Sequence, residues 1–196
     1  SRMGVRDMPI DLERRYSEIL AAMGQDRALS RYLSPRLRIP TVHRGNRRIR
    51  LIVLGQDPTV KDEKSRDGIN IVLNLKGHGA LHNYLQRICL ELGLDLNQNV
   101  YATNFVKNFF IAPPTQIKEI DVLALAAKYW MPLLHEELDE FPDAPVITLG
   151  QPLLTHIINK GARPLVRDYW DYKPHWGKNP PTDWRLLEPH ENVLNR

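Results

Sequence analysis

The sequence predicts an α/β protein, a three-layer α/β/α sandwich around a central, mainly parallel sheet of four or five strands. Apolar runs of strand length alternate along the chain with amphipathic segments of helix length, which is typical of parallel sheets covered by helices. The strand expected over 48–54 is apolar enough at its end to be buried on both faces, as strands of parallel sheets are.

The first 47 residues are expected to form a basic helical extension of one domain that spans residues 1–196. Apolar residues recur at spacings of three and four over 11–29, and Asp11 can cap the start of a helix there. Residues 30–46 contain two prolines and a glycine and are expected to be irregular. A length of 196 residues suits one domain.

The other elements follow from length, periodicity and breaking residues. A helix over 80–92 should end at Gly93, and a long helix over 116–139 should begin at a Thr115 cap and kink at Pro132. Further strands are expected over 69–75, 99–104, 145–149 and 184–187, and a further helix over 151–160.

Composition excludes several classes of site and indicates a class of partner. No apolar run is long enough to span a membrane. The single cysteine, Cys89, excludes a disulfide framework and a cysteine-ligated metal cluster, and favours a cytoplasmic or nuclear protein. Residues 1–50 carry 12 basic against five acidic residues, including the run RGNRRIR (44–50). This excess is compatible with a polyanionic partner and equally with a solvated arginine face.

Polar residues follow three of the expected strands, where sites form in open α/β sheets. They are the turn GQDPT (55–59), Asn104 and the segment PHEN (189–192). Together an Asp, an Asn and a His can act on a nucleobase. The carboxylate stabilises positive charge on the sugar, the amide pairs with the base edge, and the imidazole donates to the departing oxygen.

Six segments form an ordered set along the chain: VLGQDPT (53–59), DGIN (67–70), GALHNYLQRICLEL (79–92), VYATNFVK (100–107), APVITLG (144–150) and PHENVLNR (189–196). In this order they resemble motifs of the uracil-DNA glycosylase superfamily. The resemblance implies that Asp57 orients the attacking water and that His190 bonds the departing base. It further implies that Gln56 and Asn104 contact the base and that Leu194 fills the gap left by a flipped nucleotide. Arg196 would contact a phosphate. The implied partner is DNA containing uracil or a related damaged base, bound by a monomer without a metal or cofactor, in base excision repair.

Five residues depart from the family pattern. Thr59 replaces a tyrosine that walls the base pocket, Ile71 replaces a stacking aromatic, and Ala80 replaces a serine that touches phosphate. Glu191 and Asn192 replace Pro-Ser after the histidine. Together these changes indicate either altered base specificity or lost catalysis. Two alternatives therefore stay open: a catalytically inactive module that binds nucleic acid or protein, and a small-molecule hydrolase that uses the same cleft.

Other conspicuous residues are interpreted as structural. His78 and His82 are four residues apart, but the flanking Gly77 and Gly79 argue against a shared helical face and a metal pair. The aromatic residues of 169–184 are expected to pack over the sheet rather than to stack on bases.

Overall fold

The computed structural model describes residues 10–34, 36–159 and 187–196. The chain forms two compact units, Ser1–Ile147 and Thr148–Arg196.

The fold is mixed α/β, with a four-stranded open sheet in the order β1-β3-β2-β4. Its strands are β1 (His43–Arg44), β2 (Leu51–Gly55), β3 (Val100–Asn104) and β4 (Val146–Thr148). The two central strands are parallel, and every residue of both is buried, which confirms the predicted doubly buried strand.

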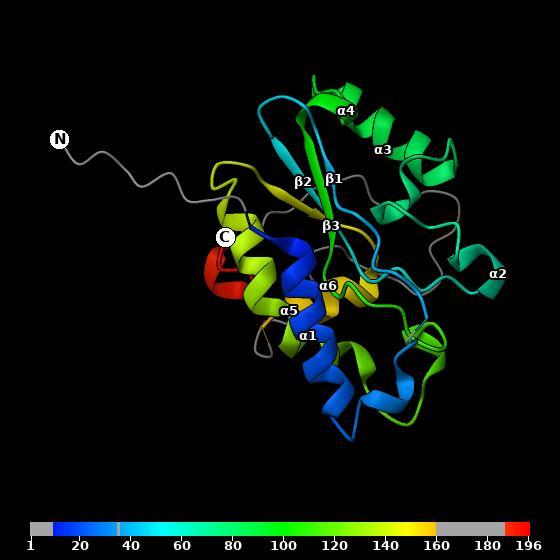
Figure 1. Ribbon diagram of the computed structural model, residues 1–196. Coiled ribbons are helices and arrows are strands. Elements are labelled where there is room, and N and C mark those ends of the chain that lie inside the picture. The colour runs from blue at the N-terminus through cyan, green and yellow to red at the C-terminus, as the bar shows by residue number, and fades with distance from the viewer. Residues whose placement is uncertain (1–9, 35, 160–186) are drawn as a thin grey trace, which may run out of the picture. The chain divides into compact units, whose positions relative to one another are not determined.

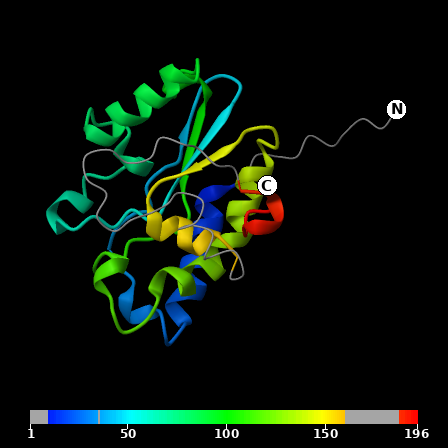
Figure 2. The same cartoon turned by 180° about the vertical axis from the view of Figure 1, so that it is seen from behind.

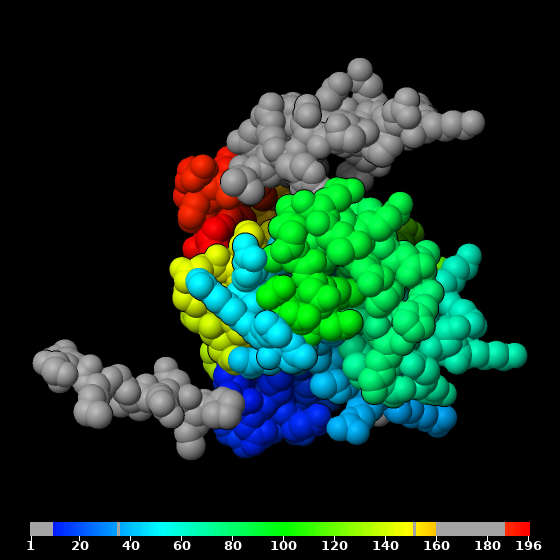
Figure 3. All heavy atoms as spheres, turned by 90° about the horizontal axis from the view of Figure 1, so that it is seen from above, coloured from blue at the N-terminus to red at the C-terminus, as the bar shows by residue number. Residues whose placement is uncertain are grey.

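β1 corrects the expectation that residues 30–46 are irregular. It pairs antiparallel with β3, through His43 opposite Ala102 and Arg44 opposite Tyr101. Two residues are too short to show a periodicity, so the sequence contains no local signal for this strand. The connection from β1 to β2 crosses one end of the first unit, where Figure 3 shows it in cyan between the green of α4–β3 and the yellow residues that precede β4.

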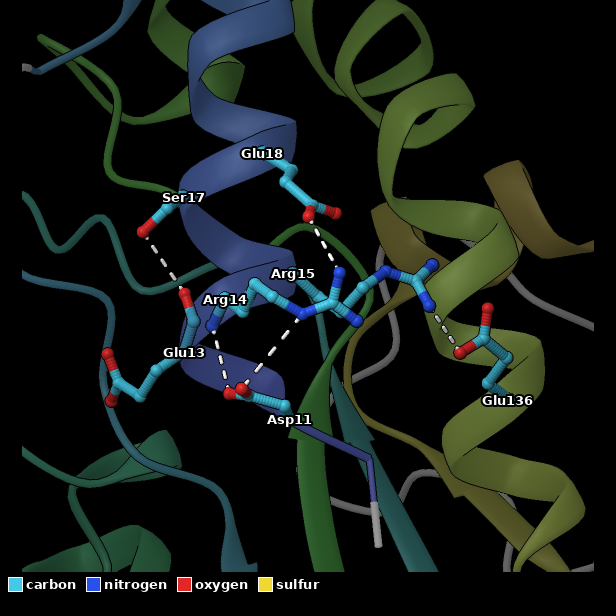
Figure 4. Close-up of polar contacts among 7 residues, drawn as sticks. All are labelled: Asp11, Glu13, Arg14, Arg15, Ser17, Glu18 and Glu136. Atoms are coloured by element: carbon cyan, nitrogen blue, oxygen red, sulfur yellow. Dashed lines mark hydrogen bonds and ion pairs between the residues drawn. The ribbon is translucent and has the colours of Figure 1, made fainter. Parts of the chain in front are cut away.

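Helices α1 (Leu12–Gln25) and α5 (Val122–Asp139) lie side by side (Figures 1 and 2). Asp11 caps α1 by accepting a hydrogen bond from the Arg14 N–H at 3.1 Å, as predicted. Figure 4 shows the ion pair between the helices, in which Arg15 reaches Glu136 at 2.5 Å. The Tyr16 ring also meets Trp130 edge to face, with centroids 5.9 Å apart. The helix of the predicted basic extension is therefore packed into the first unit.

The long helix starts six residues later than predicted. Thr115 lies in a short 3₁₀ turn, η3 (Pro114–Gln116), and the cap of α5 is Asp121, which accepts from the Ala124 N–H at 2.9 Å. A carboxylate at the N-cap also interacts favourably with the helix dipole, which favours Asp121 as the start. The helix runs through Pro132, which is exposed.

The remaining helices of the first unit are short apart from α3. Gly93 has φ +66° directly after the α3 C-cap, which confirms the predicted stop. The bounds are η1 (Ser30–Tyr32), α2 (Glu63–Arg66), η2 (Val72–Asn74), α3 (Ala80–Glu91) and α4 (Leu96–Asn99). The prediction of a strand over 69–75 was wrong, because the chain turns there through η2 with positive φ at Leu73 and Asn74.

The second unit contains α6 (Gln151–Ile157), shorter than the predicted 151–160, and the 3₁₀ turn η4 (Pro189–Glu191). Ile158 and Asn192 form an antiparallel bridge. The predicted strand 184–187, apart from its last residue, and the aromatic residues of 169–184 lie outside the described residues. Within the described ranges, no helix has the length and apolar character needed to cross a membrane.

Candidate functional site

The carboxyl ends of β2 and β3 meet, because the two strands pair in parallel register from Leu51 opposite Val100 to Gly55 opposite Asn104. The pairing continues past the strands: Phe105 N–H donates to the Gly55 carbonyl at 2.8 Å and Val106 N–H to the Gln56 carbonyl at 2.9 Å. The GQDPT turn therefore leaves the sheet at the edge where Asn104 ends its strand.

Asp57 is held at both carboxylate oxygens. Gln56 Nε2 donates to Oδ1 at 2.8 Å, and the backbone N–H of Thr59 donates to Oδ2 at 3.0 Å. Burial raises the pKa of the Asp57 carboxyl, against the two hydrogen-bonding neighbours and the charge of Arg66, which lower it. The carboxylate that closes the turn is thus also oriented and partly withdrawn from water.

Thr59 and Arg66 fasten this turn to the segment that follows β3. The buried Thr59 hydroxyl accepts a hydrogen bond from the Phe110 N–H at 2.8 Å. The guanidinium of Arg66, 6% exposed, donates to the Val60 carbonyl at 2.9 Å and to the Ile111 carbonyl at 3.1 Å. The Thr59 side chain thus accepts a hydrogen bond from the backbone of Phe110, which holds the turn against the segment after β3. Sequence reasoning missed Arg66, because nothing local distinguishes it within a charged loop.

Asn104 is 2% exposed, and its Oδ1 is buried with no hydrogen-bond partner among the residues that the structure describes. The amide lies against Gly55: a Cβ at that position would overlap both Asn104 Oδ1 and Leu73 Cδ2. A buried unpaired amide oxygen is costly, by about 1–3 kcal/mol. Such an oxygen could accept a hydrogen bond from a donor that reaches it.

The segment that packs over Gly55 is strained. Leu73 and Asn74 have φ of 59° and 51°, in the left-handed region that costs a side-chain-bearing residue roughly 1–2 kcal/mol. Ile71, the predicted stacking position, is partly buried and bridges Thr41 through backbone pairing. Non-glycine residues in this conformation concentrate at functional sites. Ala80 lies farther along, exposed at the first residue of α3.

A buried network of charged and polar side chains contacts the carboxyl end of β3. Lys107 Nζ lies 2.6 Å from Glu137 Oε2, 2.6 Å from Thr103 Oγ1 and 3.0 Å from the Asn104 carbonyl. Glu137 Oε1 accepts from Tyr101 at 2.7 Å and from Thr103 at 3.0 Å. Burial lowers the pKa of Lys107, whereas Glu137 raises it. Sequence reasoning missed this network; a lysine within the apolar run FVKNFF was its only local signal.

Three predicted residues belong to the second unit. His190 is exposed, and its backbone carbonyl accepts from Asn159 Nδ2 at 2.6 Å. Leu194 is 6% exposed, and its N–H donates to Asn192 Oδ1 at 3.0 Å. A side chain that enters a DNA helix must be exposed, so Leu194 would have to move before it could act as a wedge. The Arg196 carbonyl accepts from Asn192 Nδ2 at 3.1 Å.

No cluster of three or more metal-ligating side chains occurs in the described residues. The rings of His78 and His82 meet edge to face at 5.2 Å, and His82 is buried. Comparison with protein-family models and with curated proteins finds no match to this chain.

Proposed function

We propose that this protein is a monomeric DNA glycosylase related to the uracil-DNA glycosylase superfamily, with a three-layer α/β/α fold, acting on DNA in the cytoplasm or nucleus. The observation that carries the proposal is the pairing of Gly55 with Asn104. This register brings an oriented carboxylate and an unpaired amide oxygen to the same sheet edge. The ordered motifs along the chain support the same assignment.

The reaction would be a hydrolysis at the sugar of a flipped nucleotide. The bond between C1′ and the base nitrogen breaks, and its electron pair leaves with the base. Asp57 stabilises the positive charge that develops on the sugar and orients a water molecule, whose oxygen bonds to C1′. The water's proton passes to the carboxylate and then to solvent.

Asn104 would hold the base edge by its amide, since an amide offers both a donor and an acceptor. The resemblance alone supplies the roles of His190 at the departing oxygen and of Arg196 at a phosphate. Gln56 has a second role here, because its side chain orients Asp57 by the 2.8 Å hydrogen bond.

The catalytic form of Asp57 is the ionised one, and burial raises its pKa. Base release should therefore increase with pH through the raised pKa of this carboxyl. An acid limb that lies at the ordinary pKa of an aspartate, about 3.9, would contradict this assignment.

One observation favours a second candidate, a glycosylase-like module that binds DNA without cleaving it. Asn104 is almost completely buried beside Leu73, and Thr59 uses its hydroxyl to bind the Phe110 backbone. A site closed in this way needs a rearrangement before a base can enter.

A uracil-containing oligonucleotide, followed by alkaline cleavage, separates the two candidates. The glycosylase releases uracil, and Asp57→Asn abolishes the release while DNA binding remains. Asp67→Asn is the matched control, because it removes the same charge from an exposed position ten residues away. DNA binding without release by the unmodified protein supports the module; equal activity of the two variants refutes the role of Asp57. An absence of both binding and release would leave the small-molecule hydrolase, to be screened with nucleosides and nucleotides.

A further inference from the structure

The arginine loop, residues 44–50 (RGNRRIR), lies at the opposite end of β2 from the candidate site. Arg50 directly precedes β2, whereas Gln56 and Asp57 directly follow it. A five-residue strand spans roughly 16 Å. The loop therefore presents its charges on a surface that is distinct from the GQDPT edge.

The backbone of the arginine loop is fixed to α4 and the start of β3. Arg47 N–H donates to the Gln98 carbonyl at 2.9 Å, and Arg50 N–H donates to the Asn99 carbonyl at 2.8 Å. Gly45 packs so closely on the Gln98 carbonyl that a Cβ would overlap it. Its arginines thus project from a preorganised backbone, which lowers the entropic cost of binding a ligand.

The arginines of the loop differ in how they are paired. Arg44 forms an ion pair of 3.0 Å with Glu140 and lies over the Phe141 ring, 5.1 Å from its centroid. Arg48 is 3.6 Å from Asp143, and both side chains are mostly exposed, at 79% and 85%. Such an exposed pair contributes only about 0–1 kcal/mol, so Arg48 can exchange its partner easily.

Arg47 is exposed and forms no ion pair within the described part of the chain. It lines a groove of about 290 Å³ together with Arg44 and Arg48, and the same groove is also lined by Glu140, Phe141, Pro142 and Asp143. Counted over the described residues, the groove therefore combines one guanidinium without an ion pair, one in a weak ion pair and one in a close ion pair.

We propose that this groove binds the phosphate backbone of a nucleic-acid strand, through Arg47 and Arg48. The guanidinium fork matches phosphate geometry, and an exchangeable partner such as Asp143 leaves Arg48 free to bind. Arg44 lines the groove while it remains paired with Glu140. The contact is independent of base sequence, and it does not depend on glycosidic cleavage, because it uses none of the residues of the GQDPT edge.

The test measures binding of labelled duplex DNA by fluorescence anisotropy between 50 and 200 mM salt. Two lost phosphate contacts reduce the slope of log affinity against log salt by about 1.8, so the wild type should lose about 12-fold more affinity than Arg47→Ala/Arg48→Ala over this range. The control Arg27→Ala/Arg36→Ala removes the same charge from exposed arginines outside the loop and should keep the wild-type slope.

A third variant tests the competition with Asp143. Asp143→Asn releases Arg48 and should tighten DNA binding at 50 mM salt, whereas Glu18→Gln, on an exposed face of α1, should not. An unchanged slope in the double variant, or an equal decrease in the control pair, would overturn the proposal. The proposal would also be overturned if Arg47→Ala/Arg48→Ala lost binding to the polyanion heparin but bound DNA as the wild type does.

The same measurements keep this proposal separate from the glycosylase proposal. Asp57→Asn should bind DNA as the wild type does, and loss of uracil release in that variant leaves the arginine groove unaffected. Conversely, loss of the salt-dependent contact in Arg47→Ala/Arg48→Ala at unchanged uracil release from saturating DNA supports the groove as a separate surface.

Discussion

Substituting Lys107→Met removes the positive charge from the buried network beneath Asn104. Lys107 is 2% exposed and Glu137 1% exposed, so neither charge can reach water in the folded protein. The substitution leaves the Glu137 carboxylate buried without a cation, and it also removes the donor that the Asn104 carbonyl receives at 3.0 Å. Methionine fills a similar volume, so the loss should be electrostatic rather than a cavity effect.

The expected loss of unfolding free energy is about 3 kcal/mol. Breaking a buried ion pair from one side costs roughly 3–5 kcal/mol. Glu137 keeps its hydrogen bonds from Tyr101 at 2.7 Å and Thr103 at 3.0 Å. Because these bonds still stabilise the carboxylate, the expected cost lies at the lower end of that range of free energies. With a urea dependence of about 2 kcal/mol per molar, the midpoint should fall by roughly 1.5 M.

The control removes both charges together. Lys107→Met/Glu137→Gln keeps an acceptor for Tyr101 but leaves no buried charge, so it should recover at least half of the lost free energy. Urea unfolding followed by circular dichroism measures all three proteins. A decrease below about 1 kcal/mol in the single variant, or a double variant no more stable than the single one, would refute the interpretation of this network as a charge-balanced support.

Two further predictions concern the sheet edge itself. Because burial raises the pKa of Asp57, the folded protein binds this proton more tightly than the unfolded chain, and stability falls as pH rises from about 4 through the raised pKa. Asp57→Asn should therefore be more thermostable than the wild type at pH 8, by a margin that disappears towards pH 4; a margin that does not vary with pH would exclude this explanation. Gly55→Ala forces a Cβ into Asn104 and Leu73, which should cost about 1–3 kcal/mol in urea unfolding and remove uracil release. Gly24→Ala, in α1 with no atom within 4 Å of its added Cβ, should instead be neutral or stabilising, and equal losses in both variants would contradict the contact argument.

The local sequence pattern was sufficient to predict an element where neighbouring residues along the chain decide its burial or its backbone conformation. Apolar runs predicted the buried strands β2 and β3, and Gly93 predicted the end of α3, because burial and left-handed backbone leave a signature within a few residues. Asp11 was likewise recognised as a cap from its place before an amphipathic run. The pattern was insufficient for β1, which is too short to be periodic, and for the start of α5, where Asp121 competes with Thr115.

By itself, then, the sequence determined the alternation of strands and helices and the polar residues that follow β2 and end β3. Only the tertiary structure decided that Gly55 is in register with Asn104, that Thr59 bonds to Phe110, and that Lys107 meets Glu137 at 2.6 Å. The physical reason is that register and charge pairing join residues about 30 to 50 positions apart. Their energies depend on burial that the folded chain creates, and no short window of sequence contains it.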